Sequence, residues 1–510
     1  MIVAFAFAIR LAIGMQETLD PDEAAEAVGA LRLLHGELLI MEPNGRYLGA
    51  LDCYLMAPFL AVMGPTLLAV RVAMSVVGAL YVLAMAWLGR VLNFHRHGGL
   101  VLAAVAAVFP LFAVSFGVRA RGYSPTLLLE ALFLVLAIRV IWPASNPRRR
   151  DWAAPGLVAG LALWLHPLLA MPVGVALIAL MLRARKLPAG WLQQGLPVAI
   201  AAGLIGFAPW LVYNGVLTQL GSIRHLYSPL QAYSVSTLQG ARGVTINALP
   251  IFLGVHVTEC GQEVAPWPVV DGALLLLAGA VVWLRRRALA ELIRGRPEPA
   301  ELVFAIAPVA VLAVTLHWFN ALSCEPRYLF PLAIPLAFAV AYVLVQPLPW
   351  RGFAIAGVAA WLAGAGVTTW RSIETTPDVV YEVRANLAAE SRAIAAQRPE
   401  AVWTTFWLAR PVEFYAGDQF VVGEYGGYVG FRSTQEAAYA AEHPSWLFVE
   451  GDPTAAAFET ECARRGITYT RSEVVPGLVL YSNLSAKLTP DDLGLGGQRV
   501  DHTDPDPPRI

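Results

Sequence analysis

For about its first 370 residues the chain alternates between long apolar segments and short polar ones. Several of the apolar segments approach the roughly 20 residues that a helix needs to cross a membrane. Short polar stretches, many of them rich in arginine, separate the segments. This pattern predicts transmembrane helices near residues 1–16, 66–89, 98–116, 123–142, 154–182, 193–213, 268–284, 301–317, 328–345 and 352–370.

The basic clusters give the predicted helices a direction, because arginine-rich loops stay in the cytoplasm. The segment 154–182 has a basic cluster at both ends and is long for one helix. His166-Pro167 interrupts it, and a proline removes a helical hydrogen bond. Two short helices, 154–165 and 168–182, therefore fit better than one. The whole chain then crosses the inner (plasma) membrane eleven times, with a cytoplasmic N-terminus.

The pattern changes after residue 370. Residues 371–488 have ordinary polarity, with alternating stretches such as "AVWTTFWLA", "QFVVGEY", "SWLFVEG", "ITYTRSEV" and "LVLYSNL" and helical stretches at 383–397, 434–442 and 453–465. This predicts a small α/β domain. The last segment, 489–510, is rich in Pro, Asp and Gly and predicts disorder. The predicted fold is thus a polytopic α-helical membrane protein, residues 1–370, with a C-terminal extracytoplasmic α/β domain.

Composition agrees with a membrane protein. The chain is 57% hydrophobic and 14% charged, with a mean hydropathy of +0.58, whereas soluble domains carry about 25% charged residues. A net charge of −1 gives no reason to expect nucleic-acid binding. The four cysteines show no metal-binding spacing.

Unusual polar residues collect on the predicted outer side of the membrane. A group of acids, Glu17, Asp20, Asp22 and Glu23, directly follows the first apolar segment. Charges at a membrane interface are costly and indicate function. Carboxylates suit a general base, and arginines suit a phosphate. The mixture predicts an outward-facing site for a phosphorylated, lipid-linked substrate. The other polar residues on that side include Arg46, Asp52, Arg119, Arg121, Tyr123, His166, His256, Glu259 and Arg327.

Five motifs follow one another along the chain. The first is Asp22-Glu23-Ala24 in the first outer loop. The others are "MGPTLLAVRVAM" at the second membrane helix, Ala120-Arg121-Gly122-Tyr123, "GLALWLHP" ending at Pro167, and "RYLFPLAIP" starting at Arg327. In this order they resemble the multi-pass GT-C glycosyltransferases, the superfamily of protein O-mannosyltransferases and lipid A aminoarabinose transferases. The sequence departs from many relatives at "GRYLGALDCYL", where they have "PPL", and Glu130 lies too far into its helix to be an obvious second acid.

The resemblance implies an inverting transfer of a hexose or pentose from a polyprenyl phosphate to an acceptor on the outer face. It makes Asp22 the general base, with Glu23 and Asp20 as further catalytic candidates. Arg327 is the first candidate for the donor phosphate. The other candidates for that phosphate are Arg121, Arg46, His166 and Tyr123. The implied partners are the lipid-linked donor, membrane lipids, and a glycan, lipid or protein acceptor.

Simpler interpretations stay open for each residue. Asp20 and Asp22 can cap the following helix. Arg327 can extend to the interface, and His166 can be a satisfied buried ring. The resemblance leaves metal dependence open, because some relatives use a divalent ion such as Mg, Mn or Ca and others use none. His256 and Glu259, at i and i+3, are the weak candidates for a metal pair.

Two other functions must be weighed against transfer. One is transport or flipping of a lipid-linked sugar, and the other is a non-catalytic scaffold of the same fold. Many transporters show two repeated halves and bind their substrate near the membrane midplane. No such repeat is detectable here, and the polar residues gather at one face, so we favour the transferase.

Overall fold

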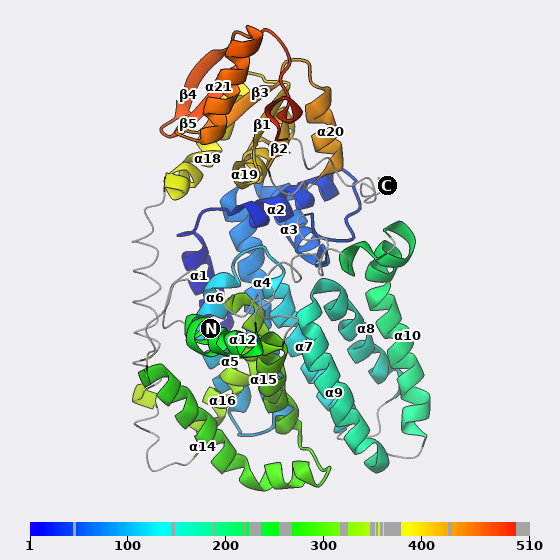
Figure 1. The fold of residues 1–510 in the computed structure, drawn as a ribbon. Helices are drawn as coiled ribbons and strands as arrows, with labels where there is room; N and C mark the ends of the chain where they lie inside the picture. Colours follow the sequence, from blue (N-terminus) through cyan, green and yellow to red (C-terminus); the bar gives the residue numbers. More distant parts are fainter. Residues whose placement is uncertain are drawn as a thin grey trace.

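The computed structural model describes residues 1–43, 47–143, 148–187, 190–218, 220–223, 236–253, 268–316, 325–346, 352, 355–357, 361, 379–426 and 431–495. They form a helical bundle and, at one end of it, a smaller domain with a β-sheet (Figure 1). We call the second part, residues 379–495, the sheet domain. The boundaries predicted at 370 and 488 stay predictions.

The bundle contains helices of very different length. Among the described residues, four helical stretches are long and apolar enough to cross a membrane: Leu67–Leu92, Tyr123–Ile141, Trp191–Leu217 and Pro326–Val345. Much of the predicted last segment, 352–370, lies outside the described residues, so the count of eleven crossings stays a prediction. The bundle helices are α1 (Ile2–Gly14), α2 (Pro21–Leu34), α3 (Leu51–Met63), α4 (Leu67–Leu92), α5 (Gly98–Val108), α6 (Leu111–Phe116), α7 (Tyr123–Ile141), α8 (Arg149–Leu165), α9 (Ala170–Arg183), α10 (Trp191–Val212), α12 (Thr237–Arg242), α13 (Leu249–Phe252), α14 (Pro268–Ile293), α15 (Pro299–Thr315) and α16 (Ala333–Val345).

The predicted break at His166-Pro167 is confirmed. Helix α8 ends at Leu165, His166 is extended, and α9 begins at Ala170 after one turn of 3₁₀-helix. Glycines then let α8 pack closely against α10. A Cβ at Gly160 would lie 2.1 Å from the carbonyl oxygen of Gly203. Such close packing of small residues is typical of helix pairs in membranes.

The apolar segment 98–116 is likewise interrupted, at Phe109-Pro110, between α5 and α6. Arg10 of α1 is buried beside this break. Its guanidinium donates to the carbonyl oxygens of Ala106 and Ala107, at 3.3 and 3.1 Å. The break leaves these carbonyls without a helical partner. A buried arginine thus satisfies backbone groups inside the bundle.

The sheet domain has five strands in the order β2-β1-β3-β5-β4. Strand β1 pairs in parallel with β2 and β3, and β5 pairs antiparallel with β3 and β4. The α/β prediction for this region is confirmed. The elements are α18 (Val379–Ala396), β1 (Ala401–Thr405), α19 (Phe406–Ala416), β2 (Val421–Tyr425), α20 (Arg432–Ala440), β3 (Ser445–Val449), α21 (Pro453–Arg465), β4 (Thr470–Val475) and β5 (Leu478–Ser482).

Helix α2 lies between the sheet domain and the bundle (Figure 1). Its residues from Glu23 to Ala30 are all buried, including both glutamates. Leu34, at the end of the helix, is 44% exposed. Because α19 also packs against α2, burial follows the position along the helix rather than one face.

Candidate active site

The site is built around the start of α2. Asp20 caps this helix: its Oδ1 accepts from the backbone N–H of Glu23 at 3.0 Å, and Glu23 Oε2 accepts from the N–H of Asp20 at 3.3 Å. Pro21 occupies the first turn, where no N–H is needed. The reciprocal pair is a capping box. For Asp20 the capping interpretation therefore describes what the residue does.

Two arginines also bind Asp20. Arg121 Nη2 lies 3.0 Å from its Oδ1, and Arg119 Nη1 lies 3.7 Å from its Oδ2. Burial raises the pKa of Asp20, but the two guanidinium groups and the N–H of Glu23 outweigh burial and lower it to about 2. A carboxylate held this firmly in its charged form is a weak base. Asp20 therefore suits positioning better than proton transfer.

Glu23 is fully buried and forms an ion pair with Arg71 of α4. The second contact of this pair, Arg71 Nη2 to Glu23 Oε2, is 3.1 Å. Glu23 Oε1 also accepts from the backbone N–H of Ala120 at 3.0 Å. Arg71 in turn donates to three backbone carbonyl oxygens, those of Gly14, Thr18 and Val118. The pair thus ties α1, α2, α4 and the loop before α7 together, with no exposed oxygen left on Glu23.

Asp22 is the most open of the four acids. Its side chain is 41% exposed, against 20%, 14% and 0% for Glu17, Asp20 and Glu23. Its carboxylate pairs with Arg121. Of the three carboxylates predicted to be catalytic, Asp22 is the one that a substrate could reach.

The loop 117–122 is held by its backbone, which leaves its arginine side chains to face the acids. The N–H of Ala120 donates to Glu23, and the N–H of Gly122 donates to Asp52. Gly122 has a φ of +78°, a conformation that favours glycine. Arg119 Nε donates to Glu17 at 2.8 Å, so each of the two arginines of this loop has at least one carboxylate partner.

Tyr123, His166 and Arg327 are brought together on the other side of Arg121. The rings of Tyr123 and His166 are 5.6 Å apart. Burial and the nearby charge of Arg327 lower the pKa of His166 to about 3, so the ring is neutral. Its Nδ1 accepts from the N–H of Leu168, which caps the turn before α9. The guanidinium of Arg327 lies over the ring of Tyr328, and its Nε is 3.3 Å from Oε2 of Glu325.

Burial and the positive charge of Arg327 both lower the pKa of Arg121. The carboxylates of Asp20 and Asp22 raise it, and the pKa of Arg121 is raised overall. Two guanidinium groups whose charges interact would both be stabilised by an anion between them. Arg121 also contacts the acids of α2.

A second group of acids lies near Asp22: Glu26 and Glu42, which the sequence did not single out, and Asp52, which it listed among the outer polar residues. Glu26 hydrogen-bonds the side chain of Glu42 and accepts from the Cys53 thiol at 2.8 Å. Burial raises the pKa of Glu42 to about 7. Asp52 is also buried, with Oδ1 unpartnered among the described residues, and burial raises its pKa to about 7.

Asp52→Asn is expected to change stability with pH. The folded state binds this proton more tightly than the unfolded chain, so wild type loses stability as pH rises from about 4 to 7 and no more above it. Asparagine removes that loss while keeping an acceptor for Gly122. We expect the stability of the variant relative to wild type to be greater at pH 8 than at pH 5 by about 3 kcal/mol, the value of the two pH units between 5 and the folded-state pKa of about 7. An equal difference at both pH values would contradict the assignment.

Several predicted residues cannot be placed. Arg46, His256 and Glu259 lie outside the described residues. Among the residues that the structure does describe, no group of three or more His, Cys, Asp and Glu side chains could hold a metal ion. Glu130 is buried in α7, and its two oxygens have no partner within the described part of the chain. None of the site residues above bonds to it.

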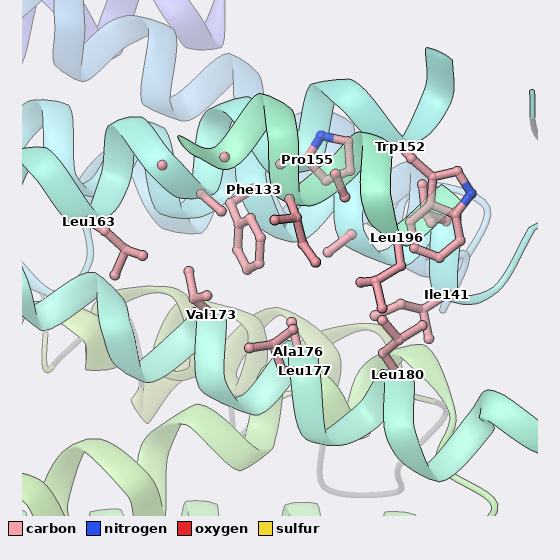
Figure 2. Close-up of a pocket in the computed structure, with 18 of the residues that line it drawn as sticks. Phe133, Ile141, Trp152, Pro155, Leu163, Val173, Ala176, Leu177, Leu180 and Leu196 are labelled. Carbon is pink, nitrogen blue, oxygen red and sulfur yellow. The ribbon is translucent and has the colours of Figure 1, made fainter. Parts of the chain in front are cut away.

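An apolar cavity of about 290 Å³ lies between α7, α8, α9 and α10. Figure 2 shows Phe133 and Leu196 on one side of it and Ala176 and Leu180 on the other. Its lining extends along α8 from Trp152 to Leu163, three residues before His166. At about 1.5 Å per residue this is a length of roughly 16 Å. The cavity therefore runs along the bundle from near the polar site.

Comparison with known proteins supports the fold. No protein-family model matches the sequence, and no curated protein matches it. The structure resembles ArnT from Cupriavidus metallidurans bound to undecaprenyl phosphate, with a TM-score of 0.59 and 15% identity over 96% of this chain and 98% of that one. It also resembles the apo state of the same protein, with a TM-score of 0.51 and 13% identity over 98% and 99% of the two chains. The predicted resemblance to GT-C proteins is confirmed at the level of the fold.

Proposed function

We propose that this protein transfers a sugar from a polyprenyl phosphate to an acceptor at the end of the bundle that carries the sheet domain. The observation that carries the proposal is the ion pair of Asp22, an accessible carboxylate, with Arg121, whose guanidinium also lies close enough to Arg327 for the two charges to interact. The similar ArnT structure holds undecaprenyl phosphate, which supports a lipid phosphate as the ligand of this fold.

In the proposed reaction, Arg121 and Arg327 bind the phosphate of the donor. The Asp22 carboxylate takes the proton from an acceptor hydroxyl, and the hydroxyl oxygen forms a bond to the anomeric carbon of the sugar. The bond from that carbon to the phosphate oxygen breaks, and its electron pair leaves with the lipid phosphate. Attack opposite the leaving group inverts the configuration. The arginines stabilise the charge that develops on the phosphate.

The remaining residues have supporting roles in this proposal. Asp20 and Glu23 hold α2 and the loop 117–122, and His166, as a neutral ring, fixes the turn between α8 and α9. The apolar cavity between α7 and α10 suits part of an isoprenoid chain, since its lining is apolar and ends near His166. We place the site on the extracytoplasmic face of the inner membrane, following the arginine distribution in the sequence.

Transport remains the second candidate from the sequence. A transporter would need a substrate site that opens to both faces in turn. Asp22, the exposed carboxylate that pairs with Arg121, lies at the start of α2 next to the sheet domain (Figure 1), and this one-sided position favours transfer.

Binding of undecaprenyl phosphate to the purified protein tests the phosphate site. Arg121→Gln and Arg327→Gln are each expected to weaken binding by about 10–100-fold, the value of one charged hydrogen bond. Arg464→Gln is the control, because Arg464 is exposed and pairs with Glu461 on α21. Wild-type affinity in both site variants would contradict the proposed phosphate site.

A further inference from the structure

A partly buried arginine joins the sheet domain to α2. Arg32 lies in the last turn of α2, and its side chain is only 14% exposed. It donates to Glu37, which follows α2, at 3.2 Å. Within the described part of the chain, its other side-chain partners belong to the sheet domain: Ser433 Oγ at 3.1 Å, Thr434 Oγ1, Glu413 Oε1 at 3.6 Å, and the ring of Phe431, 3.7 Å from the guanidinium carbon.

This contact continues into the interior of the sheet domain. The ring of Phe431 lies against both Arg32 and Arg410, the latter at 5.2 Å. Glu413 pairs with both arginines. Arg410 also pairs with Glu424 of β2, and both side chains are 1% exposed. Breaking a buried ion pair is strongly unfavourable, so this group links β2 firmly to α2.

Apolar packing supports the same connection. Phe414 of α19 and Phe431 belong to one buried cluster with Ala24, Ala27 and Val28 of α2. Helix α2 is therefore held by the sheet domain on one side and by the Glu23–Arg71 pair on the other. A shift of α2 along its axis would have to break one of these two sets of contacts.

We propose that the sheet domain positions the catalytic helix, with Arg32 as the positioning residue. This rests on the proposed function for Asp22. Asp22 and Arg32 are ten residues apart on one helix, about 15 Å, so movement at one end is transmitted to the other. Because a displacement of about 1 Å can cost 100-fold in rate, a loosened α2 would lower turnover without removing any group that touches the substrate.

The experiment compares Arg32→Ala with Ser433→Ala/Thr434→Val, which removes the hydroxyl partners from the other side. Arg464→Ala is the control. In the full-length protein, both variants are expected to increase hydrogen exchange in residues 20–34 and to lower kcat about 10-fold or more. KM for the donor should change little, since Arg121 and Arg327 are untouched. Combining the variants should cost no more than Arg32→Ala alone.

The exchange measurement keeps this inference separate from the proposed function. Unchanged exchange in α2 in both variants would overturn the inference, whatever their activity. The inference would also be overturned if both variants exchanged faster in α2 but kept the wild-type kcat. If Asp22→Asn were inactive in the same assay, the transferase proposal would still stand. If Asp22→Asn were fully active, the assignment of Asp22 as the base would fail while sugar transfer itself would stand, and Arg32 could then no longer be assigned as a positioning residue for catalysis.

Discussion

Asp22→Asn is expected to lower the rate of sugar transfer by about 10²–10⁴-fold, the usual contribution of a general base. Asparagine has nearly the same shape and can still accept a hydrogen bond from Arg121, but it cannot take a proton. Asp22 is 41% exposed, so its replacement should leave membrane insertion and melting temperature close to wild type.

The rate would be measured in membrane vesicles, as the disappearance of the lipid-linked sugar that accumulates in cells lacking the protein. Glu442→Gln, an exposed carboxylate of the sheet domain, is the matched control and should transfer at the wild-type rate. Full activity of Asp22→Asn would show that Asp22 is not the base.

Separating the Glu23–Arg71 pair is expected to have the largest effect on stability. Glu23→Gln leaves Arg71 as a buried charge with only carbonyl partners, and Arg71→Met leaves a buried carboxylate. Each should destabilise the protein by about 3–5 kcal/mol, because one charge remains unpaired away from water. The double variant should lose less than the sum of the two, since no unpaired charge remains.

Thermal unfolding of the detergent-solubilised protein measures this effect. We expect the melting temperature of each single variant to fall by several degrees. The double variant should lose less stability than the sum of the two single losses. Strict additivity, or single variants that melt with wild type, would mean that the pair does not hold the four segments together.

The membrane part of the fold was predictable where the signal was long and apolar. The helix break at His166-Pro167 followed from a proline between two basic clusters, and the structure confirms it. Helix α3, Leu51–Met63, was missed because its 13 residues are too few to span a membrane. Helix α19 was missed because "FWLARPVEFYA" follows directly on strand β1, and its first residues continue the alternating pattern.

For the candidate site, the sequence indicated the residues but not their partners. The order of the motifs indicated Asp22, Arg121 and Arg327 as candidate site residues. The structure places Asp22 and Arg121 in contact. Arg71 lay inside the quoted motif "MGPTLLAVRVAM" without being chosen, since only the fold brings it to Glu23, 48 residues away. Arg32 and Thr434 are 402 residues apart, a contact that no local pattern contains.

If the proposed function is right, the protein consumes a polyprenyl-phosphate sugar. The most direct test is mass spectrometry of lipid extracts and envelope glycans from cells lacking the protein, rescued with wild type or with Asp22→Asn. We predict that one lipid-linked sugar accumulates, that one glycan loses the same sugar, and that wild type alone restores both. Unchanged lipid-linked sugars in the cells lacking the protein would contradict the claim and favour transport or a scaffold.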